Sequence, residues 1–221
     1  MRIAQGPLGA ANQSELGHWL GISRNRVQQL LGDLGVQPHG RKYPWRRVME
    51  GVLALAPEAV GAELVDDKLM SLVEAAEELG QSTEELKGRA LRGDEPLPPL
   101  YVFGPKRQLF IRSQLLGLAR SPRNRFPELA LNDALFMSLA DLASKMGHPA
   151  KDLASAFEAK VLAEPKHVVL TGGVKRYFKA DVLRLCPSAE DDTSALDRAP
   201  EPVFAVGVLG AVARSVVRKA L

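Results

Sequence analysis

Three stretches of the 221-residue chain follow one pattern, and this repetition constrains the fold more than any other feature. They occupy residues 13–21, 71–80 and 138–147, and each ends in glycine: Gly21, Gly80 and Gly147. An aliphatic residue stands six positions after each glycine: Val27, Leu86 and Leu153. The two intervals between the glycines are long and unequal. This spacing predicts three small domains of similar design rather than a solenoid of identical short repeats.

Each stretch predicts two short helices joined by a tight turn. The first helix ends at the glycine, which tolerates the left-handed conformation after a helix. The second helix follows at once, with Ser82 and Glu85 as a capping box in the middle stretch and Ser23 as the candidate cap in the first. In the third, Pro149 suits a first helical turn. Such helix pairs are typical of a helix-turn-helix.

A β-hairpin is predicted after the second helix in two of the three stretches. Residues 100–103 and 108–111 flank the turn 104–107, and residues 167–170 and 175–178 flank the turn 171–174. Apolar, β-favouring runs around a glycine-containing turn indicate a hairpin. The first stretch has only residues 38–43 at this place, which predicts a shorter hairpin.

The middle stretch also resembles a known family. It reads Leu-Val-Glu-Ala-Ala-Glu-Glu-Leu-Gly at residues 72–80, followed by a polar helix, a hairpin and Phe-Ile-Arg-Ser-Gln-Leu at 110–115. This order is similar to the MerR/excisionase type of winged helix, a unit that also begins some phage terminase small subunits. The resemblance is clearest at 71–116, extends to 138–184, and at 13–52 covers the helix pair better than the wing. The alternative is that helix pairs merely pack with hairpins.

The resemblance implies a fold that is mainly α with short β-hairpins, built as three tandem winged helix-turn-helix-like units plus a C-terminal tail segment. Unit 1 is 1–52, with a short wing, and a connector follows at 53–70. Unit 2 is 71–118, a basic connector covers 119–136, and unit 3 is 137–186. An acidic flexible linker is expected at 187–202. The apolar and basic segment 203–221 is a candidate oligomerisation element.

Composition excludes several classes of function. The single cysteine, Cys186, rules out a disulfide within the chain and a cysteine-based zinc site. The four histidines lack metal-ligand spacing, and no phosphate-binding glycine loop or nucleophile elbow is present. We therefore predict no catalytic residue, metal or cofactor, and no enzymatic activity. No apolar run approaches the roughly 20 residues of a membrane span, so a cytoplasmic, nucleoid-associated protein without a membrane partner is expected.

Charge and side-chain type single out unit 1 as the reader of DNA. Residues 1–52 carry a net charge of +4, against −1 for 71–118 and +3 for 137–185. The second helix of a helix-turn-helix enters the major groove, where Arg pairs with guanine and Asn or Gln with adenine. We predict base contacts from four residues of this helix: Arg24, Asn25, Arg26 and Gln28. The alternative is a solvated helix face. The corresponding helix of unit 2 begins Thr83-Glu84-Glu85, and its carboxylates would be repelled by phosphate.

Further DNA contacts are expected from basic residues near the wings and on the third unit's second helix, since phosphate binding depends on Lys and Arg. These are Arg41, Lys42, Arg46, Lys106, Arg107, Lys151, Lys175 and Arg176. An ordinary solvated hairpin is the alternative for each wing. The aromatic residues Tyr43, Phe110, Phe178 and Trp19 are predicted core anchors, whereas Trp45, beside two arginines, could lie in the core or at the surface.

These residues predict a sequence-specific protein that binds double-stranded DNA, either a transcriptional regulator or an excisionase-like architectural factor of a mobile element. Two alternatives remain open. One is a protein-interaction adaptor with degenerate winged-helix units, suggested by the acidic helix of unit 2 and the apolar tail, which could also form a homo-oligomer. The other is DNA recognition in the manner of a phage terminase small subunit.

Overall fold

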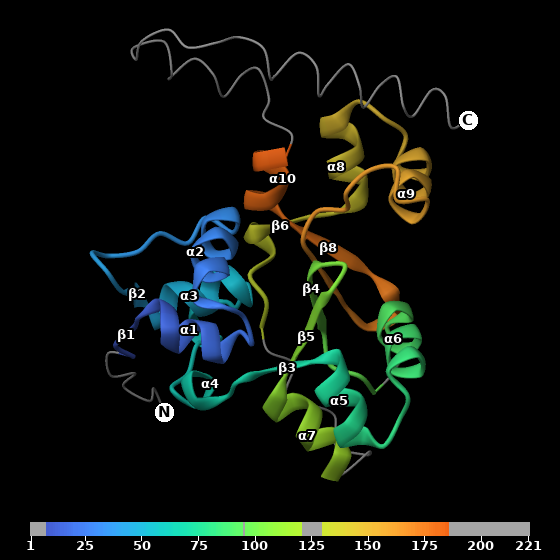
Figure 1. Cartoon of the computed structure of the whole chain (residues 1–221). Helices are drawn as coiled ribbons and strands as arrows, with labels where there is room; N and C mark the ends of the chain where they lie inside the picture. The colour runs from blue at the N-terminus through green and yellow to red at the C-terminus, as the bar shows by residue number, and fades with distance from the viewer. Residues whose placement is uncertain (1–7, 95, 121–129, 186–221) are drawn as a thin grey trace, which may run out of the picture.

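The computed structural model describes residues 8–94, 96–120 and 130–185 (Figure 1). Its α-helices are α1 (Gln13–Trp19), α2 (Arg24–Asp33), α3 (Trp45–Val52), α4 (Glu63–Asp66), α5 (Leu72–Leu79), α6 (Thr83–Arg92), α7 (Arg112–Arg120), α8 (Leu139–Met146), α9 (Ala150–Glu158) and α10 (Lys179–Leu185). The strands are β1 (Ala10–Ala11), β2 (Tyr43–Pro44), β3 (Leu69–Ser71), β4 (Leu100–Gly104), β5 (Arg107–Ile111), β6 (Phe136–Met137), β7 (His167–Val169) and β8 (Lys175–Phe178). Short 3-10 helices are η1 (Pro57–Ala59), η2 (Asp133–Leu135) and η3 (Thr171–Gly173).

The same order of elements occurs three times: a strand, two helices, one or two further strands and a last helix. We call these segments repeat 1 (residues 10–52), repeat 2 (69–120) and repeat 3 (136–185). The first helix of each begins with a capping box, in which the N-cap side chain and the third residue of the helix satisfy each other's backbone N–H groups. The predicted glycine turns are confirmed, since Gly21, Gly80 and Gly147 all have φ between 63° and 68°.

Some of the predicted helix starts differ in the structure. Ser82 caps α6 by accepting from the N–H of Glu85 at 3.2 Å, but the predicted capping box is incomplete, since the described residues show no return bond from the Ser82 N–H to the Glu85 side chain. Ser23 makes no side-chain cap bond to α2. Pro149 is the N-cap residue of α9 rather than part of its first turn. The leading strands β1, β3 and β6 were not predicted, because two or three residues are too short to show an alternating pattern.

Repeats 2 and 3 share one antiparallel sheet of six strands in the order β3-β5-β4-β7-β8-β6. The two hairpins meet edge to edge through β4 and β7, where Tyr101 lies opposite Val168. These two residues occupy equivalent positions in their repeats, because the alignment that matches Gly80 with Gly147 also matches Tyr101 with Val168. The same alignment places the β3–β5 pairs Leu69↔Ile111 and Met70↔Phe110 onto the two β6–β8 pairs. The two repeats are therefore related by an approximate two-fold axis at the Tyr101–Val168 pair.

This shared sheet overturns the predicted fold class, which was mainly α with short β-hairpins. Over the described residues, the structure is an α/β mix of about 52% helix and 18% strand. The physical reason is that a hairpin edge exposes unpaired N–H and C=O groups. Pairing β4 with β7 satisfies these groups and turns two separate hairpins into one sheet.

Repeat 1 lacks the first strand of the hairpin. Its chain from the glycine turn at Gly21 to Tyr43 in β2 is shorter than the equivalent chain of repeat 2, which runs from Gly80 to Phe110 in β5. What remains is a tight turn closed by the bridge between His39 and Lys42, together with a two-stranded β1–β2 sheet. The shorter hairpin expected from the sequence is confirmed.

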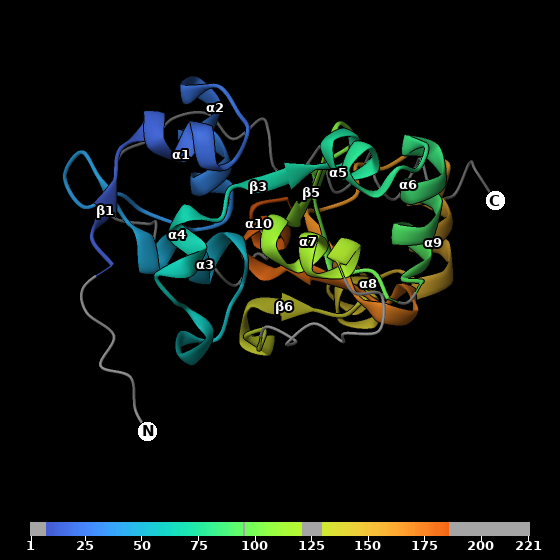
Figure 2. The same ribbon diagram turned by 90° about the horizontal axis from the view of Figure 1, so that it is seen from below.

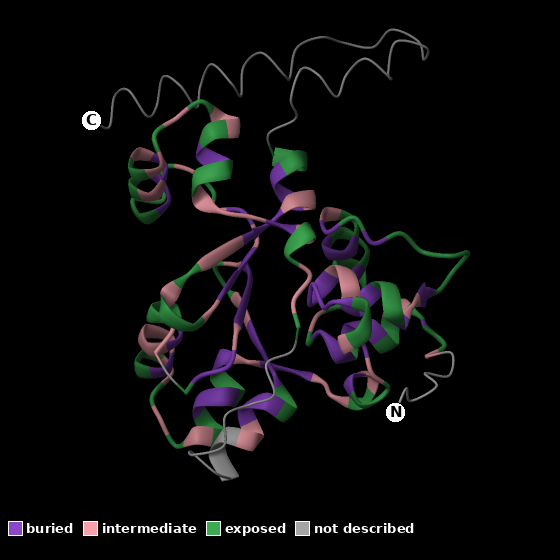
Figure 3. Ribbon diagram, turned by 180° about the vertical axis from the view of Figure 1, so that it is seen from behind, coloured by how far each residue is buried: buried purple, intermediate pink, exposed green. Residues whose placement is uncertain are grey.

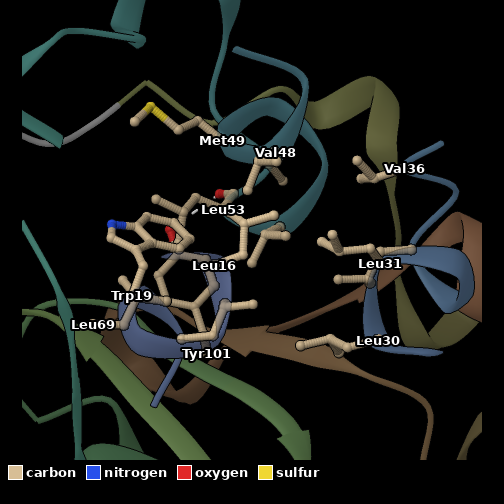
Figure 4. Packing of buried hydrophobic residues seen from close by; sticks show 14 of the residues in the cluster. Leu16, Trp19, Leu30, Leu31, Val36, Val48, Met49, Leu53, Leu69 and Tyr101 are labelled. Carbon is tan, nitrogen blue, oxygen red and sulfur yellow. Dashed lines mark hydrogen bonds between the residues drawn. The ribbon is translucent and has the colours of Figure 1, made fainter. Parts of the chain in front are cut away.

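One face of the six-stranded sheet packs against the helices of repeat 1, so the strands are buried on both sides (Figure 3). Tyr101 rises from β4 among Leu16 and Trp19 of repeat 1 and Leu53, the C-cap residue of α3 (Figure 4). Trp45 packs edge-to-face on Trp19, with ring centroids 5.4 Å apart, and is buried. The expected core positions of four aromatic residues are confirmed, each being at most 3% exposed: Trp19, Tyr43, Phe110 and Phe178.

The opposite face of the sheet is covered by the helices of repeats 2 and 3 themselves (Figure 1). Successive strand residues point to opposite faces, which explains how one strand serves both cores. Thus Tyr101 joins the core with repeat 1, whereas its neighbours Leu100 and Val102 join α5, α6 and α7. Repeat 3 builds a smaller core from Phe157, Tyr177 and four other residues.

The predicted acidic linker 187–202 and tail 203–221 lie outside the described residues, as do Arg123 and Arg125 of the basic connector. Over the ranges that the structure describes, no helix combines the length and the apolar character needed to cross a bilayer.

Candidate nucleic-acid interface

Helix α2 packs on the core of repeat 1 through its buried side, and its C-terminal end is bound to repeat 3. Val27, Leu30 and Leu31 are at most 5% exposed and face the core of repeat 1. Asp33, the carboxylate of this helix, accepts a 2.8 Å hydrogen bond from Lys166 Nζ and lies 3.3 Å from Arg184 Nε, both in repeat 3. Its negative charge is therefore neutralised by repeat 3, away from the N-terminal half of the helix.

The exposed face of α2 carries amides at its centre and arginines at its edges. With about 100° of rotation per residue, Asn25 and Gln29 lie opposite the buried residues. Gln28 and Arg24 lie toward one edge, and Arg26 lies at the other. All five side chains are exposed. The four residues predicted to read bases thus share one accessible surface, although the two arginines border it rather than occupy its middle.

A hollow of about 560 Å³ lies along the Arg24 edge of α2. Arg24 and Gln28 form one wall, and Arg41 in the turn before β2 forms another. The start of α1 completes it through Gln13, whose Oε1 accepts a 3.4 Å hydrogen bond from Arg24 Nε. No acidic side chain lines this hollow within the described chain.

The other edge of α2 faces the β4–β5 hairpin of repeat 2. Phe103 and Leu109, which flank the hairpin turn, belong to the same core cluster as Val27 and Leu30 of α2. Burial lowers the pKa of the Arg107 guanidinium, and the positive charge of Arg26 lowers that pKa further. Arg26 and Arg107 are therefore close enough to repel each other, although an arginine stays charged at neutral pH.

Five of the predicted contact residues in this region carry unneutralised charge. Among the described residues, no carboxylate lies within 4.0 Å of Arg24, Arg26, Arg41, Lys42 or Arg107. Positive charge without an internal partner favours a polyanion outside the protein. These five residues, together with Lys106 in the exposed hairpin turn, are called the basic surface below.

Two predicted residues are engaged in contacts of their own, and a third is half-buried. Arg46 pairs with Glu50 at 3.1 Å and donates to the carbonyl oxygen of Pro57 at 3.2 Å. Lys175 donates a 2.7 Å hydrogen bond to Glu164, which also accepts from the hydroxyl of Tyr177. Arg176 is half-buried, and its Nε atom is buried without a hydrogen-bond partner among the described residues.

Lys151 is exposed on α9, but it is not part of the basic surface. Helix α9 lies across the shared sheet from α2 in both of the first two views (Figures 1 and 2). The structure therefore brings together the predicted residues of unit 1, except Arg46, with those of the unit 2 wing. It leaves the three predicted residues of unit 3 elsewhere.

Two residues of this region were not among the predicted contacts. Gln29 is exposed beside Asn25, and helical periodicity from the buried Val27 could have found it. Gln13 lines the hollow with Arg24, a proximity that depends on how α1 and α2 pack and has no signal in the local sequence.

Within the described residues, neither a metal-binding group nor a similarity to known proteins indicates another functional site. The described residues contain no group of three or more His, Cys, Asp or Glu side chains able to hold a metal ion. Comparison of the chain with models of known families, with curated proteins and with solved structures found no match.

Proposed function

We propose that this protein binds double-stranded DNA sequence-specifically, with α2 of repeat 1 in the major groove. The observation that carries the proposal is the exposed amide face of α2 between two arginine edges that have no carboxylate partner in the described chain. An α-helix fits the major groove, and phosphates border that groove on both sides. A helix with reading groups in the middle and cations at its edges matches this arrangement.

The roles of the α2 residues follow from their places on the helix. Asn25, Gln28 and Gln29 can each present an amide to the N6 and N7 atoms of adenine. We assign Arg24 and Arg26 mainly to phosphates, because they border this face. This assignment refines the sequence prediction, in which both arginines read bases. Arg41 and Lys42, in the turn beside the hollow, add phosphate contacts on the Arg24 side.

The other second helices are poorer candidates for groove reading. Helix α6 exposes Glu84 and Glu85 at its start, and their carboxylates would meet phosphate with like charge. Helix α9 exposes Lys151 but lies across the sheet from the basic surface. We therefore assign base reading to repeat 1, and structural support of repeat 1 to repeats 2 and 3.

The order of elements supports the proposal that repeats 2 and 3 are winged helix-turn-helix units of the MerR/excisionase type. Each has a leading strand, a helix pair with a glycine turn, a hairpin and a closing helix. A regulator of transcription or an architectural factor of a mobile element would use such units on duplex DNA. We propose this class of function for the chain.

Fluorescence anisotropy on a labelled duplex of random sequence tests the proposal, because phosphate contacts require no particular sequence. The logarithm of the affinity should fall linearly with the logarithm of the salt concentration. The variant Arg24→Ala/Arg26→Ala should reduce that slope by about 2, since each phosphate contact contributes about 0.9. The control Arg92→Ala/Arg112→Ala removes two exposed arginines of repeat 2, of which Arg92 pairs with Asp94 at 2.7 Å, and it should keep the wild-type slope. Absence of salt-dependent binding by the wild type, or equal slopes for both variants, would overturn the proposal.

A further inference from the structure

Repeat 1 carries the proposed reading helix but lacks a complete hairpin of its own. Its shorter chain before β2 omits the strand that corresponds to β4 and β7. The remaining turn, closed by the His39–Lys42 bridge, lies on the Arg24 side of α2 together with the hollow. The Arg26 side of α2 therefore has no flanking element from its own repeat.

The hairpin of repeat 2 occupies that side. Phe103 and Leu109 flank its turn and belong to the core cluster that also contains Val27 and Leu30, so this hairpin and α2 are built on one core. Lys106 at its tip is exposed, and Arg107 beside it is half-buried. In the described chain neither cation has a carboxylate within 4.0 Å. The tip therefore places two cations beside the Arg26 edge of α2, and neither is neutralised by a carboxylate of the described chain.

The corresponding hairpin of repeat 3 lacks the two cations at its tip and is held by a different helix. In the alignment that matches Tyr101 with Val168, Gly173 and Val174 stand where repeat 2 has Lys106 and Arg107. The tip of this hairpin also packs against α6, where the N–H of Gly172 donates a 2.9 Å hydrogen bond to the carbonyl oxygen of Gly93. The two hairpins have therefore diverged: one contacts a neighbouring helix, and the other presents charge beside α2.

We propose that the β4–β5 hairpin of repeat 2 acts as the wing of repeat 1, placing Lys106 and Arg107 on the backbone of the duplex whose groove α2 enters. This inference rests on the proposed function. The interface is then composite, with the reading helix from one repeat and its flanking phosphate contacts from the next. Because backbone contacts carry no sequence information directly, the hairpin adds affinity without changing which bases are preferred.

The test compares Lys106→Ala/Arg107→Ala with the control Arg92→Ala/Arg112→Ala in the same anisotropy titrations. The hairpin variant should reduce the salt slope by about 2 and lose affinity uniformly across different duplex sequences. Circular dichroism melting identifies any loss of folding, which exposed and half-exposed substitutions are not expected to cause. An unchanged slope and affinity in the hairpin variant, with binding still weakened by Arg24→Ala/Arg26→Ala, would overturn the composite wing and leave the proposed function standing. No binding by the wild type would overturn both.

A chemical probe tests the placement directly. In a Cys186→Ser background, Arg107→Cys carrying an iron chelate should cleave the DNA backbone within the turn of duplex that α2 protects. The matched Lys151→Cys probe on α9 should leave that turn uncut. Cleavage from Arg107→Cys that falls outside the protected turn, or equal cleavage from both probes, contradicts the composite wing.

Discussion

The hydroxyl of Tyr101 donates a 3.1 Å hydrogen bond to the carbonyl oxygen of Leu53 at the end of α3. Tyr101 pairs with Val168 where the two hairpins meet, so this bond joins the middle of the shared sheet to the C-cap of α3, the last helix of repeat 1. Both groups are buried, and burial raises the pKa of the Tyr101 hydroxyl above its ordinary value of 10.0. The bond is thus part of what positions α2 relative to the hairpin of repeat 2.

Replacing Tyr101 with Phe should destabilise the protein by about 1–3 kcal/mol, because the carbonyl of Leu53 would be left buried without a partner. Urea unfolding measures this change. Tyr43→Phe is the matched control, since Tyr43 is a buried residue whose hydroxyl makes no hydrogen bond among the described residues, and it should cost less. Equal losses for the two variants would mean that the Tyr101–Leu53 bond does not stabilise the docking of repeat 1.

Asp181 should make stability depend on pH. Burial would raise the pKa of its carboxyl, but hydrogen bonds from Lys166 and Arg184 outweigh burial and hold that pKa below 3.8. A lowered pKa contributes stability that is present above the unfolded value and lost as pH falls through the folded value. Asp181→Asn should therefore destabilise the protein by about 1.5–3 kcal/mol at pH 7, because Lys166 and Arg184 lose hydrogen bonds to this carboxylate but keep Asp33 as a partner. The difference from wild type should shrink below about pH 4. Denaturant unfolding between pH 7 and pH 3 measures it, and a pH-independent difference would contradict this role.

Gly93 should be far less tolerant of alanine than Gly80. Both have φ near +65°, which costs an L-residue roughly 1–2 kcal/mol. A methyl group on Gly80 would meet no atom within 4 Å, whereas one on Gly93 would collide with the backbone of Leu170 and Gly173 in repeat 3. Gly93→Ala should therefore lower the melting temperature more than Gly80→Ala. Similar melting temperatures for the two variants would argue against close packing between α6 and the repeat 3 hairpin.

Local sequence signals predicted the parts of each repeat but not their assembly. The glycine turns and the two hairpins followed from residue types within a few positions. The shared sheet could not be predicted in this way. The pairing of β4 with β7 joins Tyr101 to Val168, which are far apart in the chain, and such a pairing produces no periodic pattern in the local sequence. The consequence was the wrong fold class.

The candidate site shows the same division between local and distant contacts. Arg24, Asn25, Arg26 and Gln28 follow a glycine turn and could be identified from the sequence. The pair of Arg46 with Glu50 could also have been foreseen, since oppositely charged side chains one helical turn apart lie on the same face. The proximity of Arg26 to Arg107 depends on how repeat 1 packs on the sheet, and no spacing in the sequence indicates it.

Selection of bound duplexes from a random-sequence pool, followed by sequencing, tests the central claim that α2 reads bases. The wild type should enrich a defined site, because amide contacts discriminate bases by about 1–3 kcal/mol each. Asn25→Ala/Gln29→Ala should lose preference at particular positions, whereas Lys106→Ala/Arg107→Ala should enrich the wild-type site with weaker binding. Failure of the wild type to enrich any site, or recovery of an unchanged site by Asn25→Ala/Gln29→Ala, would contradict the assignment of base reading to α2.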